Sequence, residues 1–179
     1  MGFLIKILIL LSFVGISRAS ICPLVFAQKY FDVTKYAGLW YEAYRHDINE
    51  EDITCINGTY TAQANGTMGV LSQGLKKLTG YYSHQGVATP KASSDPAAFL
   101  IHYKNPTQTV KYDVIATDYE NYSVVYSCDY FPIIGLRFEH IWFLSRNKTL
   151  PDSTVEALKK ILRDKLIETS GINPTPQNC

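Results

Sequence analysis

The chain has 179 residues, of which 46% are hydrophobic and 18% charged, and its formal net charge is +1 at pH 7. This length suits one domain with a sizeable core. Because the charges nearly balance and no basic cluster is present, the sequence does not predict a nucleic-acid-binding protein.

The first 19 residues have the pattern of a secretory signal peptide. Lys6 supplies the positive start, and the apolar run 7–16 is too short to span a membrane. Ser17-Arg18-Ala19 places small residues at the two positions that determine cleavage. We therefore expect residues 1–19 to be removed and residues 20–179 to form one secreted, extracellular domain.

The four cysteines all follow the predicted signal peptide: Cys22, Cys55, Cys128 and Cys179. An even number in a secreted chain predicts two disulfides, with three connectivities open. Their wide spacing argues against zinc, and we expect no metal site. Four acceptor sequences for N-glycosylation agree with secretion: Asn57, Asn65, Asn121 and Asn147.

Eight short runs rich in β-branched and aromatic residues follow, and we interpret them as strands. They cover residues 38–44, 53–62, 68–75, 79–88, 98–103, 110–117, 123–128 and 137–145. Turn signals such as Asn65-Gly66 and Asn105-Pro106 separate them. Since no helical pattern interrupts the series, the sequence predicts an antiparallel sandwich or a closed barrel.

One helix is predicted after the strands. Ser153-Thr154-Val155-Glu156 has the pattern of a capping box behind Pro151, and Gly171 is a plausible stop. One apolar stripe at helical spacing should pack on the outside of the sheet. It comprises Val155, Leu158, Ile161, Leu162 and Leu166.

The sequence carries no catalytic motif. It has no G-x-S-x-G elbow and no glycine-rich phosphate loop, and its four histidines stand on separate segments. If both disulfides form, no thiol nucleophile remains. We therefore expect a binding protein rather than an enzyme. A barrel of eight strands can hold one small ligand, but composition does not distinguish a hollow barrel from a filled one.

Three stretches in order resemble the lipocalin family. They are YFDVTKYAGLWYE (30–42) with its Gly38-Leu39-Trp40, TDYENY (117–122) and FLSR (143–146). GVATP (86–90), ATDYENYSVVYSC (116–128) and LPDSTVEALKKIL (150–162) are similar in particular to the subgroup of apolipoprotein D and the insect bilin-binding proteins. Tyr30 departs from the family, which usually has Asn there. The resemblance covers the whole of the chain after the signal peptide.

The resemblance implies an all-β fold, an eight-stranded antiparallel up-and-down barrel with one C-terminal α-helix packed outside. Trp40 should lie across the closed base with the Arg146 guanidinium on its indole, a contact worth about 0.5–2 kcal/mol. Gly38, Thr117, Asp118 and Tyr119 belong to the same structural motifs. The resemblance also implies the disulfides Cys22–Cys128 and Cys55–Cys179.

The ligand-contacting residues follow from strand alternation and from similarity to the subgroup. Outward-facing cysteines turn their neighbours at odd offsets inward and leave Asn57 outward. Glu42 should point inward near the base, where a buried carboxylate needs a partner and tyrosine hydroxyls are candidates. We expect no basic residue in the wall that would clearly favour propionates. The full set is Glu42, Tyr60, Ser72, His84, Tyr103, Tyr112, Ser127, His140 and Trp142.

The leading hypothesis is a secreted carrier of a small hydrophobic ligand, such as a fatty acid, a steroid or a related lipid, with no cofactor. One alternative is a pigment carrier that holds biliverdin. Another is a protein-binding lipocalin that acts as an inhibitor or adhesion partner. Phe131, Ile133 and Ile134, between the last two strands, should contact a lipid particle, a membrane or a second copy, unless that loop folds back as a lid.

Overall fold

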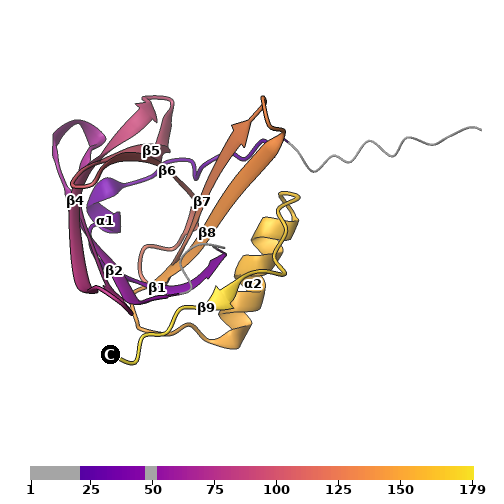
Figure 1. The fold of residues 1–179 in the computed structure, drawn as a ribbon. Coiled ribbons are helices and arrows are strands. Elements are labelled where there is room, and N and C mark those ends of the chain that lie inside the picture. The colour runs from indigo at the N-terminus through magenta and orange to yellow at the C-terminus, as the bar shows by residue number, and fades with distance from the viewer. Residues whose placement is uncertain (1–20, 47–51) are drawn as a thin grey trace, which may run out of the picture.

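The computed structural model describes residues 21–46 and 52–179, and the predicted signal peptide lies outside them (Figure 1). The main strands are β1 (Gly38–His46), β2 (Ile53–Ala62), β3 (Met68–Lys76), β4 (Gly80–Ala92), β5 (Asp95–Lys104), β6 (Thr107–Thr117), β7 (Tyr122–Phe131) and β8 (Leu136–Ser145). The helices are α1 (Val33–Tyr36), η2 (Ala64–Gly66) and α2 (Asp152–Arg163), and a short strand β9 (Asn173–Pro174) follows.

The strands form a closed barrel. Strands β2 to β8 pair in sequence order, and β1 pairs with both β8 and β2, which closes the sheet. The predicted eight-stranded up-and-down barrel with an outer helix is confirmed, with β9 as an extra strand on β1. Because successive strands alternate in direction, turns 77–79, 105–106 and 132–135 share one end, called here the open end. Turns 63–67, 93–94 and 118–121 lie at the opposite, closed end.

The interior is filled with side chains near the closed end. Tyr36, Trp40 and Phe99 are fully buried there, as are Met68 and Val114. The N-terminal segment and α1 contribute to this core, since Phe31 packs against the Tyr36 ring at a centroid distance of 5.0 Å. The strand ends that carry these residues all point to the closed end. Any unfilled space in the barrel therefore lies toward the open end.

A second core lies outside the barrel, where α2 packs beside the sheet (Figure 1). Val155, Leu158 and Leu162 of the helix are buried in the same cluster as Val124 and Phe143 of the sheet. Burial of such side chains stabilises a fold by about 1.5–3 kcal/mol each. The predicted packing of one helical stripe on the outside of the sheet is therefore correct for these three residues.

The predicted limits of α2 were wrong at both ends. The helix begins at Asp152 with Pro151 as N-cap, and no side-chain capping hydrogen bond forms, so the expected capping box is absent. It ends at Arg163 rather than near Gly171. Leu166, which we placed on the apolar stripe, follows the helix in a left-handed conformation and is 89% exposed. The predicted stripe continues past the end of the helix, because the spacing of apolar residues alone does not show where a helix ends.

The residues after α2, here called the C-terminal tail (residues 173–179), close a gap in the barrel wall. Strands β1 and β2 pair only as far as Tyr41 and Asn57, and the tail lies between them beyond that point. Thr175 N–H donates to the Ala43 carbonyl at 2.9 Å, and Cys55 N–H donates to the Pro176 carbonyl at 2.8 Å. The tail thus replaces the missing β1–β2 hydrogen bonds.

Two disulfides fasten both ends of the chain to the barrel. Cys22 is bonded to Cys128 on β7 with a Cα–Cα distance of 5.9 Å, and Cys55 on β2 is bonded to Cys179 of the tail with a Cα–Cα distance of 6.2 Å. These are the pairs that the family resemblance implied. Within residues 21–46 and 52–179, no helix has the length and hydropathy needed to span a membrane.

Candidate functional site

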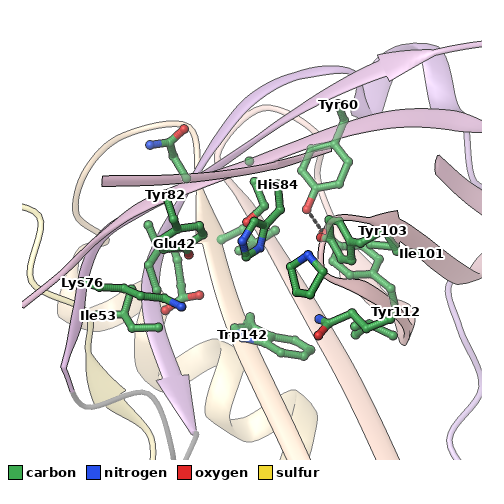
Figure 2. A pocket seen from close by; sticks show the side chains of 18 residues that line it. Glu42, Ile53, Tyr60, Lys76, Tyr82, His84, Ile101, Tyr103, Tyr112 and Trp142 are labelled. Carbon is green, nitrogen blue, oxygen red and sulfur yellow. Dashed lines mark hydrogen bonds between the residues drawn. The ribbon is translucent and has the colours of Figure 1, made fainter. Parts of the chain in front are cut away.

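A cavity of about 300 Å³ occupies the open half of the barrel. Its wall is drawn from strands β1 to β6 and β8, and Figure 2 shows aromatic side chains converging on it. The lining residues are Glu42, Ile53, Ile56, Asn57, Gly58, Tyr60, Ser72, Lys76, Tyr82, His84, Ile101, Tyr103, Pro106, Gln108, Val110, Tyr112, Trp142 and Leu144. The cavity therefore combines aromatic and aliphatic surface with a few polar groups, as ligand sites do.

Two glycines leave room for tyrosine rings in this wall. A Cβ on Gly74 would stand 2.7 Å from the ring of Tyr82, its partner across β3 and β4. A Cβ on Gly86 would stand 2.9 Å from the ring of Tyr103, its partner on β5. Because these distances are too short for a real side chain, each glycine keeps its tyrosine ring close to the strand. The cavity shape thus depends on residues that have no side chain themselves.

The closed end is held by Arg146. Its guanidinium carbon lies 3.7 Å from the centroid of the Trp40 ring, a cation–π contact. The same group donates to five backbone carbonyls within 3.3 Å, those of Leu39, Ala37, Tyr119, Lys35 and Tyr36. Trp40 Nε1–H donates to the Tyr36 carbonyl at 2.8 Å. Neither Arg146 nor Trp40 borders the cavity, so both act on the fold.

The turn between β6 and β7 is organised by Asp118. Its Oδ1 accepts the N–H groups of Glu120, Asn121 and Tyr122 at 3.1, 2.8 and 2.9 Å. Burial alone would raise the pKa of Asp118, but the hydrogen bonds from Tyr122 and Asn121 outweigh it and hold this pKa below its usual value. Thr117 Oγ1 donates to the Tyr122 carbonyl at 2.7 Å and accepts the Tyr119 N–H at 2.9 Å.

Comparison with known proteins identifies the family. The model of the lipocalin / cytosolic fatty-acid binding protein family matches residues 37–178, which is most of the chain. The chain belongs to the lipocalin family. It is 39% identical to apolipoprotein D of Oryctolagus cuniculus over 160 residues, which are 88% of this chain and 84% of that one. It is 38% identical to apolipoprotein D of Bos taurus over the same shares of the two chains.

The fold of this lipocalin agrees with solved structures. Insecticyanin from the tobacco hornworm Manduca sexta superposes with a TM-score of 0.75, at 24% identity, over 87% of this chain and 86% of that one. At this identity the likeness concerns the fold alone. It supports the barrel with its outer helix.

The structure brings seven of the nine predicted ligand-contacting residues to the cavity of this lipocalin. These are Glu42, Tyr60, Ser72, His84, Tyr103, Tyr112 and Trp142. Ser127 and His140 are cross-strand partners on β7 and β8 and do not border it. The His140 ring instead stacks on Trp142, with centroids 5.6 Å apart and planes within 8°. Alternation placed them on the inner face, but the cavity does not extend that far along β8.

Two partners of Glu42 were not foreseen from the sequence. Its Oε1 receives hydrogen bonds from Arg45 Nη1 at 3.1 Å and from Thr175 Oγ1 at 2.8 Å. Glu42 and Arg45 are both buried. Each charge has the other as a partner, which limits the free-energy cost of burying them. A bulge between Glu42 and Tyr44 shifts the alternation of β1, so Arg45 lies on the same side as Glu42. Simple alternation would have put Arg45 outside.

The expectation that the wall holds no basic residue favouring propionates was wrong, because Lys76 borders the cavity. Its Nζ lies 5.2 Å from the centroid of the Tyr82 ring. Partial burial and the nearby Lys76 charge lower the pKa of His84, which favours its neutral form. Lys76 is four residues after Ser72 on β3, so strand alternation puts both side chains on the inner face. It was missed because the predicted strand ended at residue 75, one residue too early.

The predicted glycan acceptors differ in their surroundings. Asn65, Asn121 and Asn147 are exposed, the first two at the closed end. Asn57, which we placed on the outer face, is instead half-buried, and it borders the cavity at the point where β1 and β2 separate. A sugar on Asn57 would therefore lie beside the C-terminal tail, whereas sugars on Asn65 and Asn121 would leave the open end clear.

Proposed function

We propose that this lipocalin is a secreted carrier that binds a small hydrophobic ligand, a fatty acid, a steroid or a related lipid, inside its barrel. The observation that carries the proposal is the cavity itself, which is lined mainly by aromatic and aliphatic side chains and opens away from the filled half of the barrel. The identity of 38–39% to apolipoprotein D supports it.

The cavity size sets the expected affinity. Its 300 Å³ lies at the lower end of the range of about 300–1,000 Å³ seen for ligand pockets, which favours a compact ligand. A ligand of about 20–25 non-hydrogen atoms at about 0.3 kcal/mol per atom binds with about −7 kcal/mol. That free energy corresponds to a Kd of roughly 10 μM.

Quenching of tryptophan fluorescence tests the proposal, because Trp142 borders the cavity while Trp40 is fully buried at the base. We expect saturable quenching by a fatty acid or a steroid, and at least a ~10-fold loss of affinity in Ser72→Phe, whose ring would fill the cavity. Gln73→Phe is the matched control, since Gln73 is the next residue on β3 and is exposed on the outer face.

Two results would contradict this proposal. If Ser72→Phe and Gln73→Phe bind equally well, the ligand lies elsewhere on the molecule. If no apolar compound binds to the unmodified protein, the protein-binding alternative, an inhibitor or adhesion partner, is favoured instead. Catalysis by a pocket thiol has no support, because all four cysteines are paired.

A pigment carrier is the second candidate, and Lys76 favours it. A lysine at the cavity wall can pair with a propionate, and the neutral His84 can hydrogen-bond a pyrrole. Added biliverdin should then change its absorption spectrum on binding, and Lys76→Met should weaken that binding. An unchanged spectrum at saturating protein would remove the pigment candidate.

We also propose that the predicted signal peptide directs the protein out of the cell and that the exposed loop between β7 and β8 contacts lipid. Two disulfides are typical of an oxidising compartment. Ile133 is 98% exposed and Ile134 61%, and neither they nor Phe131 border the cavity, which favours a contact surface over a lid. Contact with a second copy is the competing explanation of this apolar loop.

A further inference from the structure

Four hydroxyl groups form one continuous chain at the floor of the cavity. The Tyr60 hydroxyl lies 2.7 Å from that of Tyr112, which lies 2.8 Å from that of Tyr36, which lies 3.1 Å from Ser123 Oγ. They come from β2, β6, α1 and β7, and Figure 2 shows the Tyr60 hydroxyl directed at Tyr112. Tyr60 and Tyr112 border the cavity, whereas Tyr36 and Ser123 are fully buried beneath it.

The direction of this chain follows from counting protons. Four hydroxyls carry four protons but share three hydrogen bonds, so one proton is left over, and a head-to-tail chain, which cooperativity favours, leaves it at one end. Among the described residues Tyr36 is the hydrogen-bond partner of the Ser123 hydroxyl, and a proton left at that sealed end would be buried without an acceptor, which is costly. The favoured order therefore donates from Ser123 through Tyr36 and Tyr112 to Tyr60.

The leftover proton then belongs to Tyr60, at the end that faces the cavity. All three phenols stay protonated, because burial raises the pKa of Tyr36 to about 12 and raises the pKa values of Tyr60 and Tyr112 well above 10. Each donor in such a chain also polarises the next, so the terminal hydroxyl is a stronger hydrogen-bond donor than an isolated phenol.

We propose that the Tyr60 hydroxyl is the deep polar subsite of this cavity, where it donates to a neutral acceptor such as a ketone or ester carbonyl on an apolar ligand. This proposal rests on the proposed carrier function. A neutral acceptor fits better than a carboxylate, because one phenol at the buried floor would not compensate the loss of hydration of a charge. The cationic wall residue, Lys76, lies at the opposite, open end of β3.

A matched pair of probes tests the subsite. One is 6-propionyl-2-(dimethylamino)naphthalene, whose emission shifts to longer wavelength when its carbonyl accepts a hydrogen bond. The other is the analogue with propyl in place of propionyl, which has no acceptor. We expect the unmodified protein to bind the carbonyl probe about 3- to 10-fold more tightly, the range that one net hydrogen bond supplies. The carbonyl stretch of the bound probe should move to lower wavenumber.

The variants are Tyr60→Phe and the double change Tyr60→Phe with Tyr112→Phe, because the Tyr112 hydroxyl also borders the cavity and can replace the first donor. The double variant should lose the preference for the carbonyl probe and the emission shift, while its affinity for the propyl probe stays within 2-fold. Tyr126→Phe is the control, since Tyr126 is equally buried but packs in the outer core and donates to Glu139.

The outcomes separate the two proposals. Equal binding of both probes by the unmodified protein, with no change in the double variant, overturns the subsite and leaves the carrier function standing. Binding of neither probe overturns the carrier function. Loss of both probes in the double variant, with an altered near-ultraviolet circular dichroism spectrum, shows a damaged fold; Tyr60→Phe alone must then reduce the carbonyl preference, or the subsite is rejected.

Discussion

At the scale of single residues, Arg146 gives the clearest prediction of stability. Arg146→Lys keeps the charge but removes the planar group that reaches five carbonyls and the Trp40 ring. We expect the free energy of unfolding to fall by about 2–4 kcal/mol, because hydrogen bonds to charged groups are worth about 1.5–3 kcal/mol and several are lost without full additivity. Equilibrium denaturation in urea measures this change.

Arg163→Lys is the control for that experiment. Arg163 is half exposed at the end of α2, 3.9 Å from Glu156, and such surface pairs contribute about 0–1 kcal/mol. Equal losses in the two variants would mean that Arg146 acts only as a surface charge.

Residue roles set by local chain geometry could be predicted from the sequence, and roles set by irregular pairing could not. Trp40 and Arg146 were found from short motifs, and Tyr60 from alternation along β2, whose pairing with β3 is regular from Asn57 onward. Arg45 was missed because one bulge in β1 turns its side chain to the other face. Thr175, the second partner of Glu42, is 133 residues away in sequence, and no local pattern links them.

At the scale of elements, strand interiors were predicted well and element ends less well. β-branched and aromatic runs located each of the eight main strands, but β4 extends to Ala92 and β7 to Phe131, beyond the predicted ends. Backbone pairing with a neighbour continues a strand through residues of low strand propensity, such as Pro90 opposite Phe99. Similarly, α2 ends at Arg163 rather than near Gly171, although Ile167 and Ile172 beyond it still belong to the outer core.

The C-terminal tail gives the prediction at this scale. Gln177 Nε2 donates to the carbonyls of Glu42 and Ile56, at 2.9 Å each, and so bridges β1 and β2 where they no longer pair. Changing Cys55 and Cys179 to Ala should release the tail. The backbone amides at position 55 and at Thr175 should then exchange their hydrogens faster. The free energy of unfolding should also fall by about 2–5 kcal/mol, since the disulfide closes a loop of more than a hundred residues.

The other disulfide provides a matched control. Changing Cys22 and Cys128 to Ala removes the disulfide that closes a loop of similar length. It should lower the free energy of unfolding by a similar amount. It does not touch the tail, so the amides between β1 and β2 should keep their protection. If both variants expose these amides equally, the tail is not what closes the gap.

At the scale of the whole molecule, the family resemblance predicted the barrel and its two ends, but not which part is hollow. The filled half results from the inward path of residues before β1, where Phe31 and Tyr36 pack under the strands. The hollow half depends on ring orientations over Gly74 and Gly86. These are matters of three-dimensional packing, so the sequence predicted the members of the wall better than the volume they leave.

The open end as a whole should bind lipid surfaces. Besides Ile133 and Ile134, Leu78 of the β3–β4 turn is 90% exposed and Tyr81 is 78% exposed. Lys76 and Lys77 beside that turn carry positive charge, which favours anionic lipid. We expect the protein to float with phosphatidylcholine vesicles that contain phosphatidylserine. Ile133→Ser with Ile134→Ser should weaken this binding at least ~10-fold, because two exposed apolar side chains lose their burial in the membrane.

Tyr30→Ser is the control for vesicle binding, since Tyr30 is 94% exposed but lies next to Phe31, which packs on Tyr119 of a closed-end turn. It should leave vesicle binding unchanged. Sedimentation of the same variants distinguishes the competing explanation: a dimer that dissociates in the double Ile variant, without any vesicle binding, would assign the loop to contact between two copies. If neither vesicle binding nor sedimentation changes, the exposed loop has no role as a contact surface.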